Sequence, residues 1–233
     1  MISIDRVYKT VLTYVNSDIR GNVTPAELKL AVNDSVQEIY EEYIIELNRF
    51  LNRENRGLIG GGIENMPDRI REKLQHFSTT ATLTYSAPNF VLPANYRYID
   101  MVYTNLGRVE IMKNAREFRT ILNFSHTAPT LTRPIALQQG TNLKILPTTI
   151  VSNVSIDYLR NPLLANWTYN VVSGAEIYNP SANDHQDVDL HPSEENNLII
   201  RVAQRFGVNL KETDLQASTT SEKTQDSNNE MQS

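Results

Sequence analysis

Four side chains of metal-binding types alternate along one short segment: His185, Asp187, Asp189 and His191. Alternate side chains of a β-strand project to the same face, so a strand here would gather all four. Two imidazoles and two carboxylates suit zinc, manganese or iron, and a metal-dependent hydrolase is therefore one hypothesis for the protein. The alternative is a half-buried strand with the apolar Val188 and Leu190 on its other face. We favour the alternative and predict that the protein binds no metal and no other cofactor.

The other sequence patterns that could indicate catalysis each have a structural interpretation. The chain has no cysteine, which excludes a thiolate zinc site and a thiol nucleophile. Gly60, Gly61 and Gly62 lack the lysine and hydroxyl of a phosphate-binding loop and follow a predicted helix, so a mobile loop or hinge is the natural interpretation. Glu41 and Glu42 are neighbours on a predicted helix and do not face each other. We predict that the protein is not an enzyme.

The charge balance is mildly acidic. Lys and Arg total 22 against 27 Asp and Glu, a net charge of −5, which argues against a protein whose main task is to grip nucleic acid. Arg49, Arg53 and Arg56 could line a surface that meets DNA, but Glu46 and Glu54 are interleaved with them, as in a solvated helix end. No apolar run approaches the roughly 18 residues that span a bilayer, and we expect no membrane partner and no secretory signal.

Apolar periodicity predicts four longer elements of helix. The first runs from Ile4 to Val15, with Ser3 placed to cap it. The second opens on a capping box, Thr24-Pro25-Ala26-Glu27, and continues to Phe50, about 39 Å in length. A third spans 67–77, and the last starts near Ser193 and ends at Gly207 as its C-terminal cap.

Between these helices the hydrophobic period changes to two, which predicts strands. The candidate strands lie at 81–85, 96–103, 109–111, 135–138, 143–146 and 154–158, with a small helix at 115–123. Gly140-Thr141-Asn142 joins two of them as a hairpin. Loop residues dominate 163–184.

The predicted fold class is α+β: an N-terminal helical bundle with a long capped helix, an antiparallel β-rich middle domain, a C-terminal helix that packs back on the bundle, and an extended polar tail. The expected boundaries are 1–78, 79–184, 185–210 and 211–233. The tail contains only three apolar residues, so we expect it to be disordered alone and ordered only by a partner.

Three groups of residues carry a family resemblance. They are 15–21, 24–28, Asn33 and 38–40 near the N-terminus; 90–96, 133–135, 143–147 and 156–162, followed by Trp167, in the middle; and 189–195 at the end. In this order they resemble the ring or head–tail connector proteins in the neck of short-tailed bacteriophages. The likeness is closest to those of crAss-like phages and related phages of Bacteroidetes, which are loosely akin to tail tubular protein A.

The resemblance implies a structural virion protein made of a helical bundle and a β-rich domain. Such proteins form a homo-oligomeric, twelve-fold ring below the portal and extend the channel through which the genome leaves. Its partners would be the portal protein, adjacent neck or tail proteins and, transiently, double-stranded DNA in the lumen. The protein would assemble in the host bacterial cytoplasm and reside in the virion. Another structural role in the particle, as a tail hub or capsid accessory protein, is the alternative.

Seven residues are our predicted contacts to neighbouring subunits or partners. They are Arg49, Arg53, Arg56, Gly60, Gly61, Gly62 and Trp167.

Overall fold

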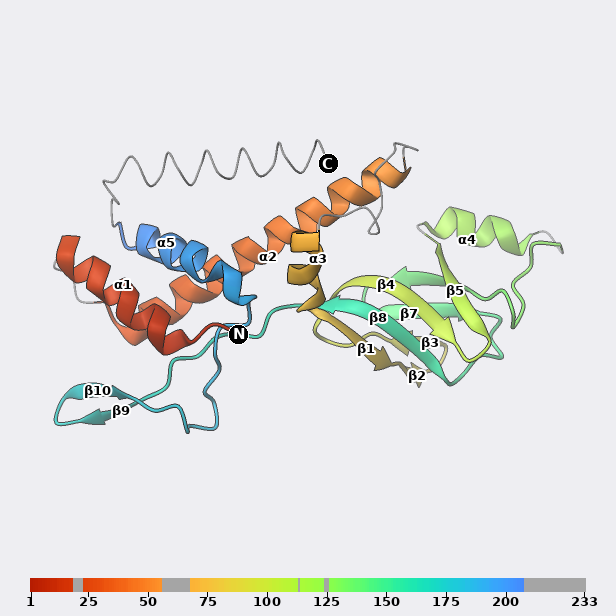
Figure 1. Ribbon diagram of the computed structural model, residues 1–233. Coiled ribbons are helices and arrows are strands. Elements are labelled where there is room, and N and C mark those ends of the chain that lie inside the picture. Colours follow the sequence, from red (N-terminus) through yellow and green to blue (C-terminus); the bar gives the residue numbers. More distant parts are fainter. Residues whose placement is uncertain (19–22, 56–67, 113, 124–125, 208–233) are drawn as a thin grey trace. The chain divides into compact units, whose positions relative to one another are not determined.

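The computed structural model describes residues 1–18, 23–55, 68–112, 114–123 and 126–207 (Figure 1). The protein is α+β with a large sheet, and the chain divides into two compact units. The first, here called the helical unit, comprises Met1–His76 and Pro162–Ser233, and the second, the sheet unit, comprises Phe77–Asn161. Residues 162–184, which the sequence assigned to a β-rich domain, thus belong with the helices. The predicted tail, 211–233, lies outside the described residues.

Three long helices and a short one form most of the helical unit: α1 (Ile4–Asp18), α2 (Pro25–Asn55), α3 (Asp68–Gln75) and α5 (Glu195–Arg205). The unit also holds the two-stranded sheet of β9 (Tyr169–Val172) and β10 (Ala175–Tyr178), and a single turn of 3-10 helix, η2 (Pro192–Glu194). The apolar stripes predicted for α1, α2 and α5 are buried, which confirms these helices. Gly207 follows α5 with a positive φ of 74°, as predicted for its cap.

The N-termini of α1 and α2 are capped in different ways. The capping box of α2 is formed: the Thr24 amide donates to Glu27 Oε2 over 2.9 Å, and the Glu27 amide donates to Thr24 Oγ1 over 3.3 Å. These hydrogen bonds, from the Thr24 backbone and then from its side chain, hold the pKa of Glu27 below its ordinary value. At α1, the first helical amide, Ile4, donates to Asp187 Oδ1 over 3.0 Å. The carboxylate thus takes the role that the sequence assigned to Ser3.

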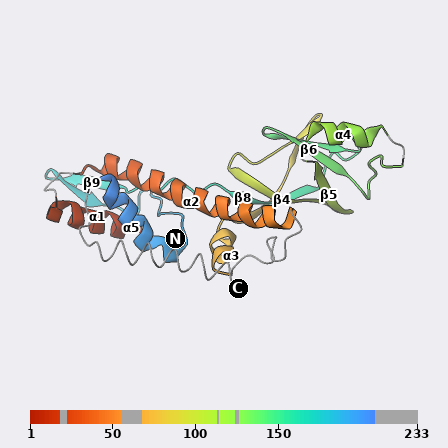
Figure 2. The ribbon, with the colours of Figure 1, turned by 90° about the horizontal axis from the view of Figure 1, so that it is seen from above.

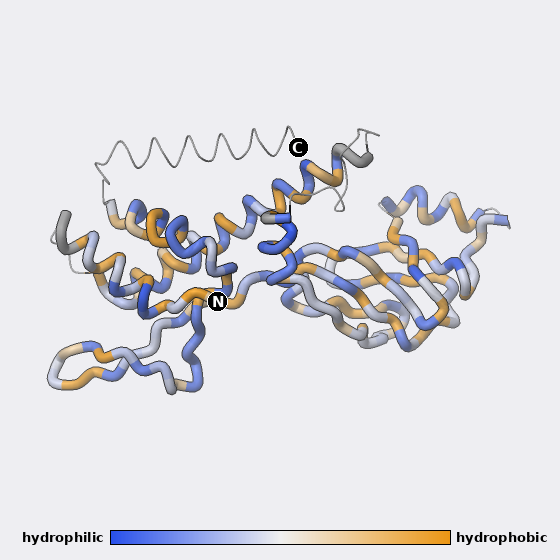
Figure 3. Tube along the Cα trace, in the orientation of Figure 1, coloured by the Kyte–Doolittle hydropathy of each residue, from blue (hydrophilic) through white to orange (hydrophobic). Residues whose placement is uncertain are grey.

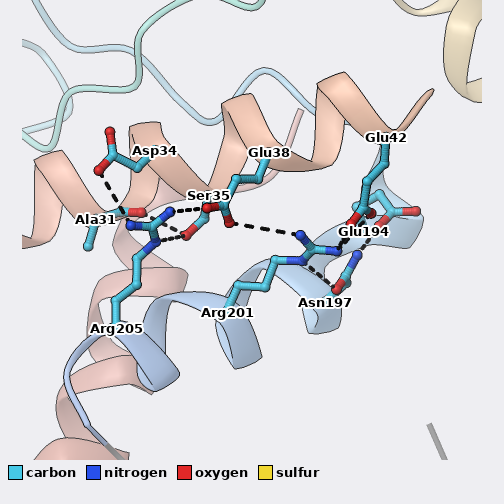
Figure 4. Close-up of polar contacts among 9 residues, drawn as sticks. All are labelled: Ala31, Asp34, Ser35, Glu38, Glu42, Glu194, Asn197, Arg201 and Arg205. Atoms are coloured by element: carbon cyan, nitrogen blue, oxygen red, sulfur yellow. Dashed lines mark hydrogen bonds and ion pairs between the residues drawn. The ribbon is translucent and has the colours of Figure 1, made fainter. Parts of the chain in front are cut away.

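Helix α5 lies alongside α2 and is tied to it by two arginines (Figures 2 and 4). Arg201 places one guanidinium nitrogen 2.7 Å from both carboxylate oxygens of Glu42. Arg205 contacts Glu38 at 2.6 Å, Ser35 at 3.1 Å and Asp34 at 3.5 Å. Half-exposed pairs of this kind contribute little individually, so burial of the apolar face of α5 dominates the packing and the arginines set its register.

The sheet unit contains eight strands in the order β1-β8-β4-β5-β6-β7-β3-β2. The strands are β1 (Ser78–Thr82), β2 (Thr84–Ser86), β3 (Asn89–Val91), β4 (Tyr96–Thr104), β5 (Gly107–Met112), β6 (Ile135–Gln139), β7 (Asn142–Leu146) and β8 (Val154–Arg160). The two outer strands of this order, β1 and β2, are consecutive pieces of one segment divided at Leu83. The same stretch of chain therefore pairs with β8 at one end and with β3 at the other, and the sheet curls back on itself.

The sheet packs apolar side chains on both faces. The enclosed face carries the larger core: Leu83, Phe90, Leu92, Val102, Val109, Ala136, Leu143, Ile145, Val154, Ile156 and Tyr158. On the other face, helix α4 (Ala115–Leu122) covers Met112, Ile135 and Leu137 with Phe118. Helix α4 connects β5 to β6, which pair in parallel, so the predicted antiparallel domain has one parallel pair.

Candidate partner-binding surface

The four alternating histidines and aspartates do not converge. Residues 185–191 form no continuous strand; single β-bridges join Gln186 to Asn166 and Val188 to Ile2. Among the described residues, no group of three or more His, Asp or Glu side chains is arranged to hold a metal ion. The predicted set of metal ligands is therefore not brought together in the described part of the chain.

Each of the four side chains instead serves the packing of the helical unit. Asp187 caps α1, as described above. His191 caps η2 through Nδ1, which accepts from the Ser193 amide, and its Nε2 lies 3.5 Å from Glu72. The His185 ring lies edge-on to Tyr178.

Asp189 joins distant parts of the helical unit. It is fully buried, accepts a hydrogen bond from the Leu163 amide over 2.9 Å, and lies 2.9 Å from His76 Nε2. His76 is the last residue before the chain enters the sheet unit, and Leu163 follows just after it returns. One carboxylate thus holds both linkers.

A second buried carboxylate, Glu194, lies close by in the sequence. Its Oε1 atom is 2.6 Å from Lys73 Nζ, and its other oxygen accepts from the Asn197 side chain over 2.8 Å. Burial opposes ionisation, but the hydrogen bonds from Asn197 and Lys73 outweigh it, so the pKa of Glu194 lies below its ordinary value of about 4.5. Burial and then this negative charge raise the pKa of the nearby Tyr43 hydroxyl. The site is a structural ion pair between α3 and η2.

We expect this pair to make stability depend on pH. Because the folded pKa of Glu194 is lowered, the stabilisation is present above the unfolded pKa of about 4.5 and is lost as pH falls through the folded value. Glu194→Gln should therefore destabilise most at pH 7, with the difference from wild type shrinking in acid. Urea unfolding between pH 3 and 7 measures this, with the exposed Glu117→Gln as control. A difference that does not depend on pH would contradict the assignment.

Trp167, which we predicted to be a contact to a partner, is internal. Its ring is 6% exposed and stacks on Tyr8 of α1 at 4.0 Å between centroids, and its Nε1–H donates to Asp5 Oδ1 over 3.2 Å. Two further tyrosines, Tyr169 and Tyr178, stack against it at 5.4 and 6.0 Å. An aromatic stack thus fastens the base of β9 and β10 to α1.

The hairpin that begins at this stack exposes apolar side chains on both of its strands. Its strands pair Tyr178 with Tyr169 and Ala175 with Val172, around a two-residue turn at Ser173 and Gly174. Both turn residues have positive φ, 52° and 82°, as a type I′ turn requires. Val171, Val172 and Ile177 are 66%, 52% and 52% exposed, and Figure 3 shows the hydrophobic residues along both strands.

Register divides these side chains between the two faces of the hairpin. Tyr169, Val171, Glu176 and Tyr178 share the face that meets Trp167 at its base. Asn170, Val172, Ala175 and Ile177 share the other, and all four are exposed. Both outer edges of this two-stranded sheet are unpaired among the described residues. Two strands alone are marginally stable in water, and open edges with apolar side chains are typical of surfaces that another chain covers.

The composition of the sequence predicts a loop rather than this hairpin, because loop residues dominate 163–184. A local signal is present: Ser173-Gly174, a turn dipeptide, lies between two runs rich in Val, Ile and Tyr.

The other predicted partner contacts lie at or beyond the end of α2. Arg49 is exposed on α2. Arg53 belongs to α2, but its side chain is outside the described residues. Arg56, Gly60, Gly61 and Gly62 lie outside the described residues altogether.

No protein-family model and no curated protein matches this chain. In the part of the chain that the structure describes, none of the helices carries an apolar stretch sufficient to cross a membrane.

Proposed function

We propose that this protein is a non-enzymatic structural component of a tailed bacteriophage that forms a ring in the head–tail connector, below the portal. The order of sequence motifs that resembles phage neck proteins motivates the proposal. In it α1, α2 and α5 form the helical bundle of each subunit, and the ring extends the channel through which DNA leaves. The portal and adjacent neck or tail proteins are the partners.

The β9–β10 hairpin is the observation that best supports an assembled protein. Both of its edges are unpaired among the described residues and Val171, Val172 and Ile177 are exposed, yet its base is anchored by a buried tryptophan. An anchored apolar arm loses little conformational entropy when it docks, which favours association. The net negative charge suits a conduit, because a strongly basic wall would retain DNA.

Location and copy number on phage particles test the proposal. We expect an affinity label on this protein to be seen at the neck by electron microscopy, and quantitative mass spectrometry to count one closed ring per particle. A label over the capsid or the tail tip would reject the connector, and absence from purified particles would reject a virion role.

A variant of the hairpin tests whether this surface is needed. Val172→Glu with Ile177→Glu places two charges on exposed positions, so the chain should fold normally but be depleted from particles at least tenfold. Val151→Glu, at a position 48% exposed in the sheet unit, is the matched control and should be incorporated normally. Full incorporation of the hairpin variant would contradict a role in assembly.

A further inference from the structure

The two units of this chain carry opposite charge. Between Phe77 and Asn161 there are eight Lys and Arg against four Asp and Glu, an excess of four positive charges. The rest of the chain has 14 Lys and Arg against 23 Asp and Glu, an excess of nine negative charges. Such a division gives two copies of the chain complementary surfaces.

Two of the eight cations of the sheet unit, Arg116 and Arg119, lie on α4, with the acidic Glu117 between them in the sequence. Arg116, Arg119, Thr120 and Asn123 line one shallow hollow on the outward side of this helix, away from the buried Phe118. Arg116 and Arg119 are exposed and form no ion pair with any described residue. By contrast, six cations of the helical unit contact carboxylates within it: Arg6, Lys9, Arg71, Lys73, Arg201 and Arg205. The α4 arginines therefore remain available to a partner.

The negative charge has its own exposed face on α2. Five acidic and no basic residues lie between Asp34 and Glu46, and Asp34, Glu38 and Glu42 contact the two guanidinium groups of α5. One stripe along α2 consists of residues that follow one another at intervals of three or four. They are Leu30, Asp34, Gln37, Glu41 and Ile45. Leu30 is 67% and Ile45 is 51% exposed. We call these five residues the α2 stripe.

We propose that the α2 stripe of one copy docks on the α4 face of the next copy, which makes a head-to-tail contact between subunits. Only the closure of this contact into a ring rests on the proposed function. The pairing of the two faces follows from their charges. Asp34, which also contacts Arg205 of its own chain at 3.5 Å, and the half-buried Glu41 meet Arg116 and Arg119, and Leu30 and Ile45 are removed from water. Because the two faces differ, the contact is heterologous and closes into a ring when the rotation between copies permits.

Two other occupants fit the charges less well. A symmetric dimer through the α2 stripe would set carboxylates against carboxylates. Duplex DNA would meet a chain of net charge −5, which is weak support for phosphate binding.

Charge reversal in trans tests the pairing with the full-length chain. Arg116→Glu/Arg119→Glu and Asp34→Lys/Glu41→Lys should each raise the concentration needed for assembly at least tenfold, measured by mass photometry and sedimentation. An equimolar mixture of the two variants should assemble as wild type, since the two unchanged faces pair with each other and the two reversed faces, Lys on α2 and Glu on α4, are complementary as well. Arg108→Glu, an exposed arginine on β5, is the control and should assemble normally. Circular dichroism verifies that the variants fold.

Engineered cysteines detect the same contact when assembly is too weak for the mass of the assembled species to be measured. The natural chain has none, so Glu41→Cys mixed with Arg119→Cys should give a disulfide-linked heterodimer, whereas each variant alone should give at least tenfold less dimer. Absence of this heterodimer, equal crosslinking in the separate variants, or failure of the mixture to restore assembly overturns the proposal. Loss of duplex DNA binding in Arg116→Glu/Arg119→Glu with assembly unchanged also overturns it. These measurements use the purified protein, so they can reject this contact without rejecting the proposed location on phage particles, and the converse also holds.

Discussion

Asp189→Ala should lower the free energy of unfolding by about 2–4 kcal/mol, since each buried polar group that loses its partner costs about 1–3 kcal/mol and two groups lose their acceptor. The Asp189 side chain is fully buried, and its loss leaves the Leu163 amide and His76 Nε2 without the acceptor that holds them. A buried donor that has lost its acceptor costs the full free energy of its desolvation, because no hydrogen bond offsets it. Because both linkers to the sheet unit lose their common anchor, the effect should exceed that of any surface carboxylate.

Equilibrium urea unfolding measures this loss. Asp189→Asn keeps the volume and one acceptor oxygen, so it should cost less than alanine. Asp68→Ala is the matched control, because that side chain is 96% exposed and its ion pair at 3.5 Å should contribute less than about 1 kcal/mol. Asp189→Ala that unfolds within 1 kcal/mol of wild type would show that the two linkers are held by other contacts.

The parts of the fold that sequence predicted well are those with local causes. The start of α2 follows from Thr24 and Glu27, three residues apart, and the structure has the hydrogen bonds that their spacing requires. The hairpin of β6 and β7 follows from Gly140, whose φ is 62°. The small helix α4 begins after Asn114, whose side chain accepts from the Glu117 amide.

The parts that sequence missed depend on contacts between distant residues. Asp189 lies beside His76, 113 residues earlier, and nothing in the alternating pattern of 185–191 shows this. The same holds for Asp187, which caps a helix 183 residues away. Closure of the sheet requires Leu83 to divide one segment between β8 and β3, which is a property of tertiary pairing rather than of residue type.

The burial of Trp167 likewise depends on a contact between residues that are distant in the sequence. Trp167 was predicted to be a partner contact, but its ring is covered by Tyr8 from α1. The exposed apolar residues are instead Val171, Val172 and Ile177, a few positions later. Burial of Trp167 is decided by Tyr8 of α1, more than 150 residues away in the sequence, which the local pattern does not show.

Trp167→Ala should destabilise the helical unit by about 3–5 kcal/mol, the usual cost of truncating a buried large aromatic side chain. The indole fills the space between α1 and the hairpin, so its removal leaves a cavity beside Tyr8 and ends the hydrogen bond to Asp5. Urea unfolding measures the loss. Trp167→Phe retains an aromatic ring but not the Nε1–H donor, and should recover more than half of it. Val171→Ala, at a side chain 66% exposed on the same hairpin, should change stability by less than about 0.5 kcal/mol.

The same substitution should also release the hairpin from its support. Two strands without a core are marginal, and in this protein the stack of Tyr169 and Tyr178 on Trp167 supplies the missing apolar layer. Limited digestion with chymotrypsin, which cleaves after tyrosine, should therefore cut Trp167→Ala at least tenfold faster at these two residues than wild type or Val171→Ala. If cleavage there is as slow as in wild type, the hairpin is held by contacts other than the aromatic stack. Faster cleavage would show that the indole is what keeps an exposed apolar arm in a fixed conformation, which is the property that lets it dock at small entropic cost.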